Sequence, residues 1–129
     1  MNKIILLSFL LLSFTSCKRV CEDSKALNNN YDLFTSEDNS LCIYSKAIFY
    51  VSGPANYPPL SVYVDNQFVG NITTFYPYGP GNCSAMGCAT YQFKTGNKVD
   101  WEVRDAAGNV VNGTSEPNSY SECIKIRVY

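Results

Sequence analysis

Apolar and polar residues alternate along most of the chain after residue 45. In residues 99–104, charged side chains separate Val99, Trp101 and Val103. The alternation is clearest at the end of the chain, where Ile124, Ile126 and Val128 alternate with more polar residues. A period of two predicts a β-strand with one buried face, because successive side chains of a strand point to opposite sides. The same reasoning predicts strands at residues 46–51, 60–64, 67–72, 88–93, 110–115 and 124–129.

Turn-forming residues separate these strands. Asp65-Asn66 predicts a tight hairpin turn, and Thr95-Gly96-Asn97 and Asp105–Asn109 predict two further turns. About seven short strands without helical periodicity predict an all-β fold. We expect an antiparallel sandwich of two sheets, immunoglobulin-like in plan. The predicted core side chains are Phe49, Val51, Leu60, Val62, Val64, Phe68, Ile72, Tyr91, Phe93, Val99, Trp101, Val103, Ile124, Ile126 and Val128.

Residues 1–16 have the pattern of a signal peptide, which we expect to be helical. Lys3 supplies a positive charge, and Ile4–Leu12 is a mainly apolar run. The run is shorter than the roughly 20 residues that a helix needs to cross a bilayer. Ser16 directly before Cys17 resembles the lipobox of bacterial lipoproteins, although Phe14 stands where that motif usually has Leu.

The lipobox resemblance implies that Cys17 becomes the mature N-terminus and carries acyl chains. One acyl chain binds a membrane only marginally, whereas several hold a protein there almost permanently. We therefore expect an exported lipoprotein of the outer membrane, at its periplasmic face or on the cell surface, with the lipid membrane as a partner. The alternative is a secreted soluble protein in which Cys17 forms a disulfide.

The cysteines of an exported chain of this size predict a disulfide framework. There are six, at positions 17, 21, 42, 83, 88 and 123. Acylation of Cys17 leaves five, so one thiol stays unpaired, whereas without acylation all six can pair. The number of cysteines therefore favours the soluble alternative. We rank the lipobox above it.

Charge and composition exclude several classes of function. The net charge is −1 for the whole chain, and removal of residues 1–16 takes away Lys3 and makes it more negative. A nucleic-acid partner is therefore not expected, because such proteins need a basic face. The sequence has no histidine. It thus lacks the usual general base for a serine or cysteine nucleophile and the commonest zinc ligand.

Residues 18–45 are polar and contain too few apolar side chains to build a core alone. Cys21 and Cys42 bracket most of the segment, and a bridge between them would stabilise it by roughly 3 kcal/mol on the chain-entropy model. The stretches Cys21-Glu-Asp-Ser-Lys-Ala26 and Glu37-Asp-Asn-Ser-Leu-Cys42-Ile-Tyr44 resemble a disulfide-closed motif of exported Bacteroidota proteins. This resemblance supports a Cys21–Cys42 disulfide.

Oxygen-bearing side chains alternate within the same segment. They are Asn28, Asn30 and Asp32, with Glu37 and Asp38 downstream. Oxygen ligands at every second position resemble the start of a calcium loop. Leu33, however, occupies the position of the glycine that such loops need, and Asn-rich segments are more often simple turns. We therefore predict no metal and no cofactor.

Three further stretches carry a second resemblance, namely residues 60–73, 80–93 and 96–109, followed by a cysteine before the last strand. They resemble a small β-sandwich domain of Bacteroidota lipoproteins, in which a hairpin is followed by a cysteine loop. That family brings no established activity with it. The resemblance implies a Cys83–Cys123 disulfide and leaves Cys88 unpaired. Cys83–Cys88 and Cys88–Cys123 remain as alternatives.

Two carboxylates are the strongest candidates for catalysis. Asp100 and Glu102 share one face of a predicted strand, a pairing that glycoside hydrolysis could use. Lys98 and Arg104 lie on the same face, so a solvated, ion-paired surface is the better interpretation. We predict no catalytic residue.

Three tyrosines are candidates for binding. Tyr57 lies beside Pro58 and Pro59, and Tyr76 and Tyr78 lie in a loop rich in Pro and Gly. Exposed rings on rigid loops can stack on sugars or contact a protein. The alternative is that Tyr76 and Tyr78 cap an open end of the sandwich.

These observations divide the chain into three parts. Residues 1–16 are the lipoprotein signal peptide, residues 17–45 the tether and disulfide-closed segment, and residues 46–129 the β-sandwich domain. The expected function is that of a non-enzymatic cell-envelope lipoprotein, structural or binding, tethered through Cys17. The alternative is a surface adhesin or glycan-binding module that uses its exposed tyrosine loops.

Overall fold

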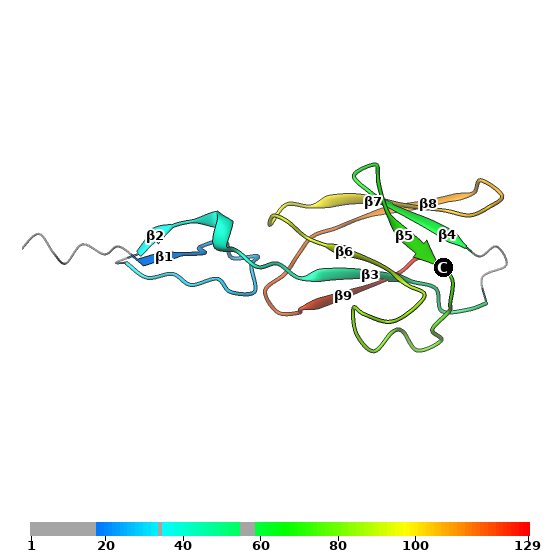
Figure 1. Ribbon diagram of the computed structural model, residues 1–129, viewed down its shortest axis with the longest axis horizontal. Coiled ribbons are helices and arrows are strands. Elements are labelled where there is room, and N and C mark those ends of the chain that lie inside the picture. The colour runs from blue at the N-terminus through cyan, green and yellow to red at the C-terminus, as the bar shows by residue number, and fades with distance from the viewer. Residues whose placement is uncertain (1–17, 34, 55–58) are drawn as a thin grey trace, which may run out of the picture.

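The computed structural model describes residues 18–33, 35–54 and 59–129. The predicted signal peptide, Cys17 and Tyr57 lie outside the described residues. Within the described part, the chain forms nine strands and one short 3-10 helix. Figure 1 shows an elongated molecule, in which two facing sheets form the larger part and a small two-stranded segment projects from one end. The fold is all-β and sandwich-like.

The first sheet has three strands in the order β6-β3-β9. The central strand β3 (Lys46–Tyr50) pairs antiparallel with β6 (Ala89–Gln92) and parallel with β9 (Cys123–Arg127). The prediction of a wholly antiparallel sandwich is therefore wrong for this pair. A hairpin forces two strands to be antiparallel, but β3 and β9 are separated by most of the domain, so their connection imposes no such direction.

The second sheet has four antiparallel strands in the order β5-β4-β7-β8. Its strands are β4 (Leu60–Val64), β5 (Gln67–Ile72), β7 (Val99–Arg104) and β8 (Val110–Ser115). The turn between β4 and β5 uses Asp65 and Asn66, whose φ angles are 47° and 64°. Asp and Asn tolerate this left-handed region better than other non-glycine residues, which suits them to a two-residue hairpin turn.

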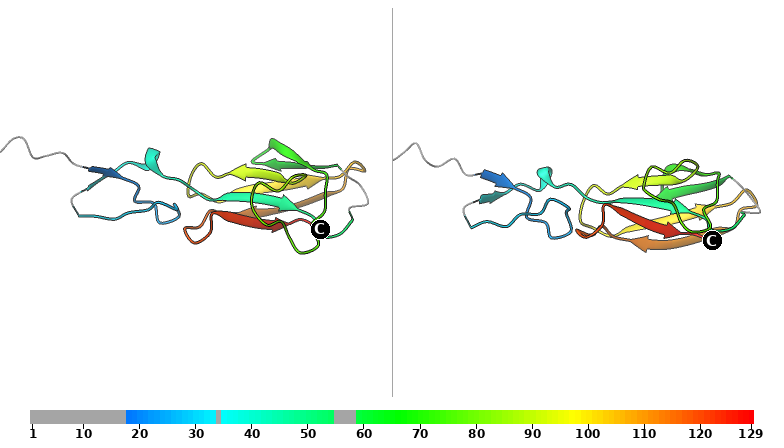
Figure 2. Two further views of the ribbon diagram at one scale, coloured as in Figure 1. Left: turned by 60° about the horizontal axis from the view of Figure 1, so that its bottom comes forward. Right: turned by 90° about the horizontal axis from the view of Figure 1, so that it is seen from below.

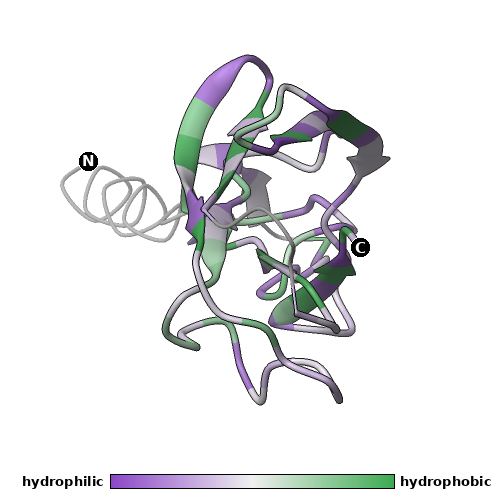
Figure 3. Cartoon of the chain, turned by 90° about the vertical axis from the view of Figure 1, so that its right-hand side faces the viewer, coloured by the Kyte–Doolittle hydropathy of each residue, from purple (hydrophilic) through white to green (hydrophobic). Residues whose placement is uncertain are grey.

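The core lies between the two sheets. Hydrophobic and hydrophilic residues alternate along the strands (Figure 3), and the buried side chains of β4 and β7 meet those of β3. The rings of Phe49 and Trp101 pack edge to face across the layers, with centroids 5.7 Å apart. Such aromatic pairs contribute beyond the area that they bury.

Phe68 is not part of this core, and its prediction as a core residue is wrong. The register between β4 and β5 shifts after Val62, so that Val62 faces Gly70 while Tyr63 faces Phe68. This β-bulge inserts one extra residue and turns Phe68 to the outer face. There it is 56% exposed and packs against the Tyr63 ring at 5.7 Å.

The N-terminal segment, residues 18–45, contains two short strands that the sequence pattern does not predict. β1 (Lys18–Val20) pairs parallel with β2 (Thr35–Glu37), and the 3-10 helix η1 (Asn39–Leu41) follows. A disulfide joins Cys21 to Cys42, with the Cα atoms 4.9 Å apart. Figure 2 shows the segment projecting from the same end of the sandwich in two further views.

Contacts attach this segment to the end of the sandwich. Cys21, Ala26 and Tyr44 are buried and belong to the same hydrophobic cluster as the strands of the two sheets. The Tyr44 hydroxyl donates a 2.7 Å hydrogen bond to Asp23, and the Lys25 ammonium lies 3.1 Å from Glu116. The N-terminal segment is therefore packed against the sandwich. Among the residues that the structure describes, no helix has the length and apolar character needed to cross a bilayer.

Candidate functional site

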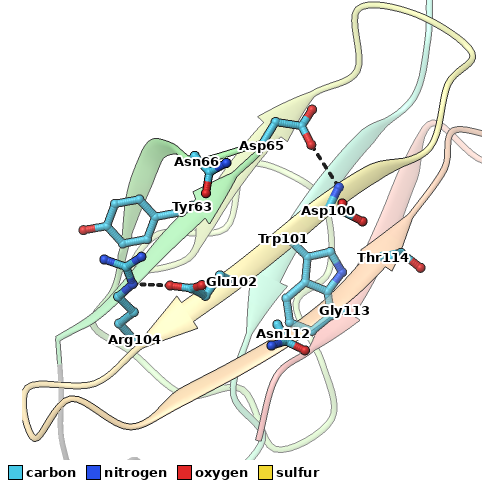
Figure 4. Close-up of a pocket in the computed structure, with 10 residues that line it drawn as sticks. All are labelled: Tyr63, Asp65, Asn66, Asp100, Trp101, Glu102, Arg104, Asn112, Gly113 and Thr114. Carbon is cyan, nitrogen blue, oxygen red and sulfur yellow. Dashed lines mark hydrogen bonds and ion pairs between the residues drawn. The ribbon is translucent and has the colours of Figure 1, made fainter.

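The four-stranded sheet carries an open depression of about 420 Å³ on its outer face. Alternation along β7 produces it, because Val99 and Val103 point into the core and the polar residues between them point outward. Figure 4 shows the side chains around it, which come from β4, β7, β8 and the β4–β5 turn. The lining residues are Tyr63, Asp65, Asn66, Asp100, Trp101, Glu102, Arg104, Asn112, Gly113 and Thr114.

Glu102 and Arg104 form an ion pair at one end of the depression. The Arg104 guanidinium also lies over the Tyr63 ring, 4.5 Å from its centroid. The hydrogen bond from Arg104 to Glu102 raises the pKa of the guanidinium. Glu102 is one of the two carboxylates predicted to share this face, and its charge is thus neutralised by Arg104, two positions further along the same strand.

Asp65 and Asp100 are linked through the backbone at the other end of the depression. The Asp65 carboxylate accepts a 3.0 Å hydrogen bond from the Asp100 N–H, and the Asp65 N–H donates to the Asp100 carbonyl at 2.8 Å. The Asp65 carboxylate therefore stabilises the hairpin turn. Within the described part of the chain, no group of three or more acidic or cysteine side chains is arranged to hold a metal ion.

Trp101 and Gly113 face each other on β7 and β8 and also line the depression, while the indole ring of Trp101 points into the core and packs against Phe49. The indole Nε1 is buried, and it has no hydrogen-bond partner among the described residues. The depression therefore combines hydroxyl, amide, carboxylate and guanidinium groups on the outer sheet face. This set can form hydrogen bonds to a polar ligand.

The long loop between β5 and β6 folds over the outer face of the three-stranded sheet. A disulfide joins Cys83 in this loop to Cys123 at the start of β9, and the Cys83 carbonyl accepts a 3.0 Å hydrogen bond from Thr90 of β6. Gly79 packs against the Tyr50 ring. Ile48, which lies on this face, is completely buried. The loop is thus held against the sheet by covalent and packing contacts.

The candidate tyrosines of this loop have different roles. The Tyr76 hydroxyl donates a 2.7 Å hydrogen bond to the Met86 carbonyl, and its N–H donates to the Val51 carbonyl at 2.8 Å. Tyr76 is half-buried and stabilises the loop, whereas Tyr78 is fully exposed. Tyr57, the third candidate, lies outside the described residues.

Two further apolar residues of the β5–β6 loop are exposed, and the sequence pattern does not single them out as candidates for binding. Phe75 is 46% exposed and Met86 is 86% exposed. They and Tyr78 belong to the same stapled loop. We call these three exposed side chains (Phe75, Tyr78 and Met86) the loop patch. An apolar residue within a Pro- and Gly-rich loop is the sequence signal that could have identified them.

Cys88 has no disulfide partner among the described cysteines. It is half-buried, and burial raises the pKa of its thiol. A thiol with a raised pKa is a poor nucleophile at neutral pH. Cys88 is therefore suited to a packing role.

The oxygen-bearing residues of the N-terminal segment serve its local structure. The Asn28 side chain donates to the Leu41 carbonyl at 2.8 Å and accepts from the Ile43 N–H at 2.7 Å. Hydrogen bonds from the Ser40 side chain and backbone lower the pKa of Asp38. These side chains thus form hydrogen bonds with backbone groups of the irregular segment.

Comparison with protein-family models finds none that matches this chain. Comparisons with curated proteins and with solved structures find no match either.

Proposed function

We propose that this chain is a non-enzymatic protein of the cell envelope, exported and tethered to a membrane through acylated Cys17. Its sandwich-like part, for which we propose an immunoglobulin-like plan and the boundaries 46–129, presents a binding surface. Two intramolecular disulfides support export, because such bonds persist in oxidising compartments.

The arrangement of the cysteines is the observation that carries the tether. The disulfides Cys21–Cys42 and Cys83–Cys123 leave Cys88 as the unpaired cysteine among those described. Cys88 directly precedes Ala89, the first residue of β6. Ala89 pairs with Phe49, which lies near the end of β3 that is farther from the N-terminal segment. The described framework therefore does not require Cys17, which supports its use as an acylation site.

The state of the carboxylates supports a non-enzymatic role. Of the candidate pair Asp100 and Glu102, Glu102 is ion-paired with Arg104, and the neighbouring Asp65 carboxylate accepts a hydrogen bond from the Asp100 N–H of β7. A general acid and base on one face need carboxyl groups free to exchange protons with a substrate. In a sequence without histidine, the outer sheet face is better suited to binding than to proton transfer.

The loop patch supports a binding role for the sandwich. Its three side chains are exposed although the loop that carries them is held by the Cys83–Cys123 bridge and by the Tyr76 hydrogen bonds. A loop that is already ordered loses little conformational entropy on binding. Exposed aromatic and methionine side chains are also enriched at protein interfaces.

Intact mass spectrometry of the mature protein, with and without reduction, tests the tether. We expect loss of residues 1–16, acyl groups on Cys17, two disulfides and one free thiol. The Cys17→Ser variant should then appear in the soluble fraction, while the Cys88→Ser variant stays with the membrane. Three disulfides and an unmodified Cys17 would refute the proposal.

A glycan-binding module is the second candidate, and the full exposure of Tyr78 favours it. A flat aromatic ring in solvent can stack on a sugar ring. A glycan array should show weaker binding for Tyr78→Ala than for the native protein. Tyr120→Ala is the matched control, because Tyr120 is 98% exposed but lies outside the loop patch. Equal binding by all three proteins would exclude this candidate.

A further inference from the structure

Two large apolar side chains are exposed at one end of the N-terminal segment. Tyr31 is 76% exposed and Leu33 is 80% exposed. They adjoin a turn in which the Thr35 N–H donates to the Asp32 carbonyl at 3.1 Å and the Thr35 hydroxyl donates to the same carbonyl at 2.7 Å. β2 begins at Thr35.

Strand pairing places the turn beside the N-terminal end of β1. β1 and β2 are parallel, and Lys18 is the register partner of Thr35. Because Lys18 follows Cys17 directly in the sequence, the turn and the proposed acylation site share one end of the segment. Figure 1 shows that this end of β1 and β2 is the one remote from the two sheets of the sandwich.

Charges around this end are of both signs. Lys18 is exposed, and Arg19 lies 3.6 Å from Asp38. Asp32 adds a further negative charge within the turn. A balanced set of charges gives little attraction to anionic lipids, so the exposed apolar surface is the main feature that this end offers to a membrane.

Single exposed apolar side chains are common on protein surfaces and by themselves indicate nothing. Tyr31 and Leu33 differ because the turn beside them is paired with Lys18, which directly follows the proposed acylation site in the sequence. Tyrosine is also enriched at membrane interfaces, where its ring is buried and its hydroxyl stays hydrated.

We propose that Tyr31 and Leu33 insert into the lipid–water interface and form a second contact with the membrane beside the acyl anchor. This inference rests on the proposed acylation of Cys17, which holds the turn at the lipid surface. An acyl anchor alone leaves a protein free to tilt. A second contact on the packed N-terminal segment orients the sandwich away from the membrane.

Tryptophan fluorescence quenching tests the inference in the full acylated protein. Leu33→Trp and the control Tyr78→Trp are each reconstituted in phosphatidylethanolamine–phosphatidylglycerol vesicles that carry a spin label near the lipid headgroup. Both positions are highly exposed, and the native Trp101 lies in the sandwich and contributes equally to both samples. We expect a blue shift and a loss of emission for the tryptophan at position 33 and neither change for that at position 78.

The outcomes separate this inference from the proposed function. Acylated protein in which position 33 is quenched no more than position 78 would overturn the membrane contact and leave the tether intact. A mass spectrum without acyl groups on Cys17 would overturn both. Loss of quenching when Tyr31→Ser is added to Leu33→Trp would identify Tyr31 as part of the contact.

Discussion

Gly113 lies directly against the indole ring of Trp101, its register partner on the neighbouring strand. A Cβ atom at position 113 would overlap the Cζ2 atom of that ring and would come within 2.8 Å of Cε2. The ring in turn packs against Phe49 of the opposite sheet. The absence of a side chain at position 113 therefore allows the tryptophan to fill the space between the layers.

Gly113→Ala should destabilise the protein by about 1–3 kcal/mol, the usual cost of overpacking a core. The indole cannot move away freely, because it also packs against Phe49 in the core. Urea denaturation followed by circular dichroism measures the change. Gly81→Ala is the matched control, because a Cβ at position 81 meets no atom within 4 Å. Equal stability of the two variants would contradict this account of the packing.

Removal of the Cys83–Cys123 bridge should cost more stability than removal of the Cys21–Cys42 bridge. The two bridges span 40 and 21 residues respectively. The chain-entropy model gives about 4 kcal/mol for the first and about 3 kcal/mol for the second. The double variants Cys83→Ser/Cys123→Ser and Cys21→Ser/Cys42→Ser can be compared by urea denaturation. The reverse order would show that strain or packing outweighs chain entropy.

Loss of stability at high pH should depend on Tyr44. Burial, together with the hydrogen bond to Asp23, raises the pKa of Tyr44 to about 12 from 10.0 in the unfolded chain. The protonated phenol is therefore favoured by folding, so this stabilisation is complete below pH 10 and is lost as the pH rises towards 12. In thermal denaturation, the stability of the Tyr44→Phe variant should fall less between pH 10 and 12 than that of the native protein. Tyr78→Phe, at an exposed position, should retain the full alkaline dependence.

Loss of stability at low pH should depend on Asp23. The hydrogen bond from the Tyr44 hydroxyl, followed by that from the Lys25 N–H, lowers the pKa of Asp23 below 3.8. Its stabilisation is therefore present above pH 3.8 and disappears as the pH falls through the lowered value. Asp23→Asn should weaken the acid dependence between pH 4 and 2. An unchanged acid profile would show that Asp23 does not link the N-terminal segment to the sandwich.

Cys88 should react slowly with alkylating agents in the folded protein. Burial raises the pKa of its thiol, so little thiolate is present at neutral pH. Iodoacetamide labelling followed by mass spectrometry should show modification only when urea unfolds the chain. Rapid labelling of the native protein would indicate a reactive thiol instead of a packed one.

Many strands are predictable because each depends on a short, local pattern. The alternation in residues 60–64, 67–72 and 99–104 places strands where the structure has β4, β5 and β7. The Asp65-Asn66 hairpin is equally local, since two residues with positive φ suffice to reverse the chain. The paired charges of Glu102 and Arg104 follow from the same alternation, which puts both on one face.

Other features could not be predicted because they depend on distant segments. Phe68 obeys the alternation but is turned outward by a bulge. Ile48 lies on the outer face of β3, yet the stapled β5–β6 loop buries it. Tyr76 and Tyr78 lie two positions apart in the same loop, and the tertiary contacts of Tyr76 with Met86 and Val51 decide which ring is exposed.

The sequence by itself determined an all-β chain with local turns, because periodicity and turn residues act over a few positions. It also contained the lipobox-like stretch before Cys17, which predicts a tether. The tertiary structure decided which cysteine stays unpaired, which loop tyrosine faces solvent, and that Tyr31 and Leu33 lie beside the start of the described chain. Each of these depends on pairing between residues far apart in the sequence, whose free energy no local pattern encodes.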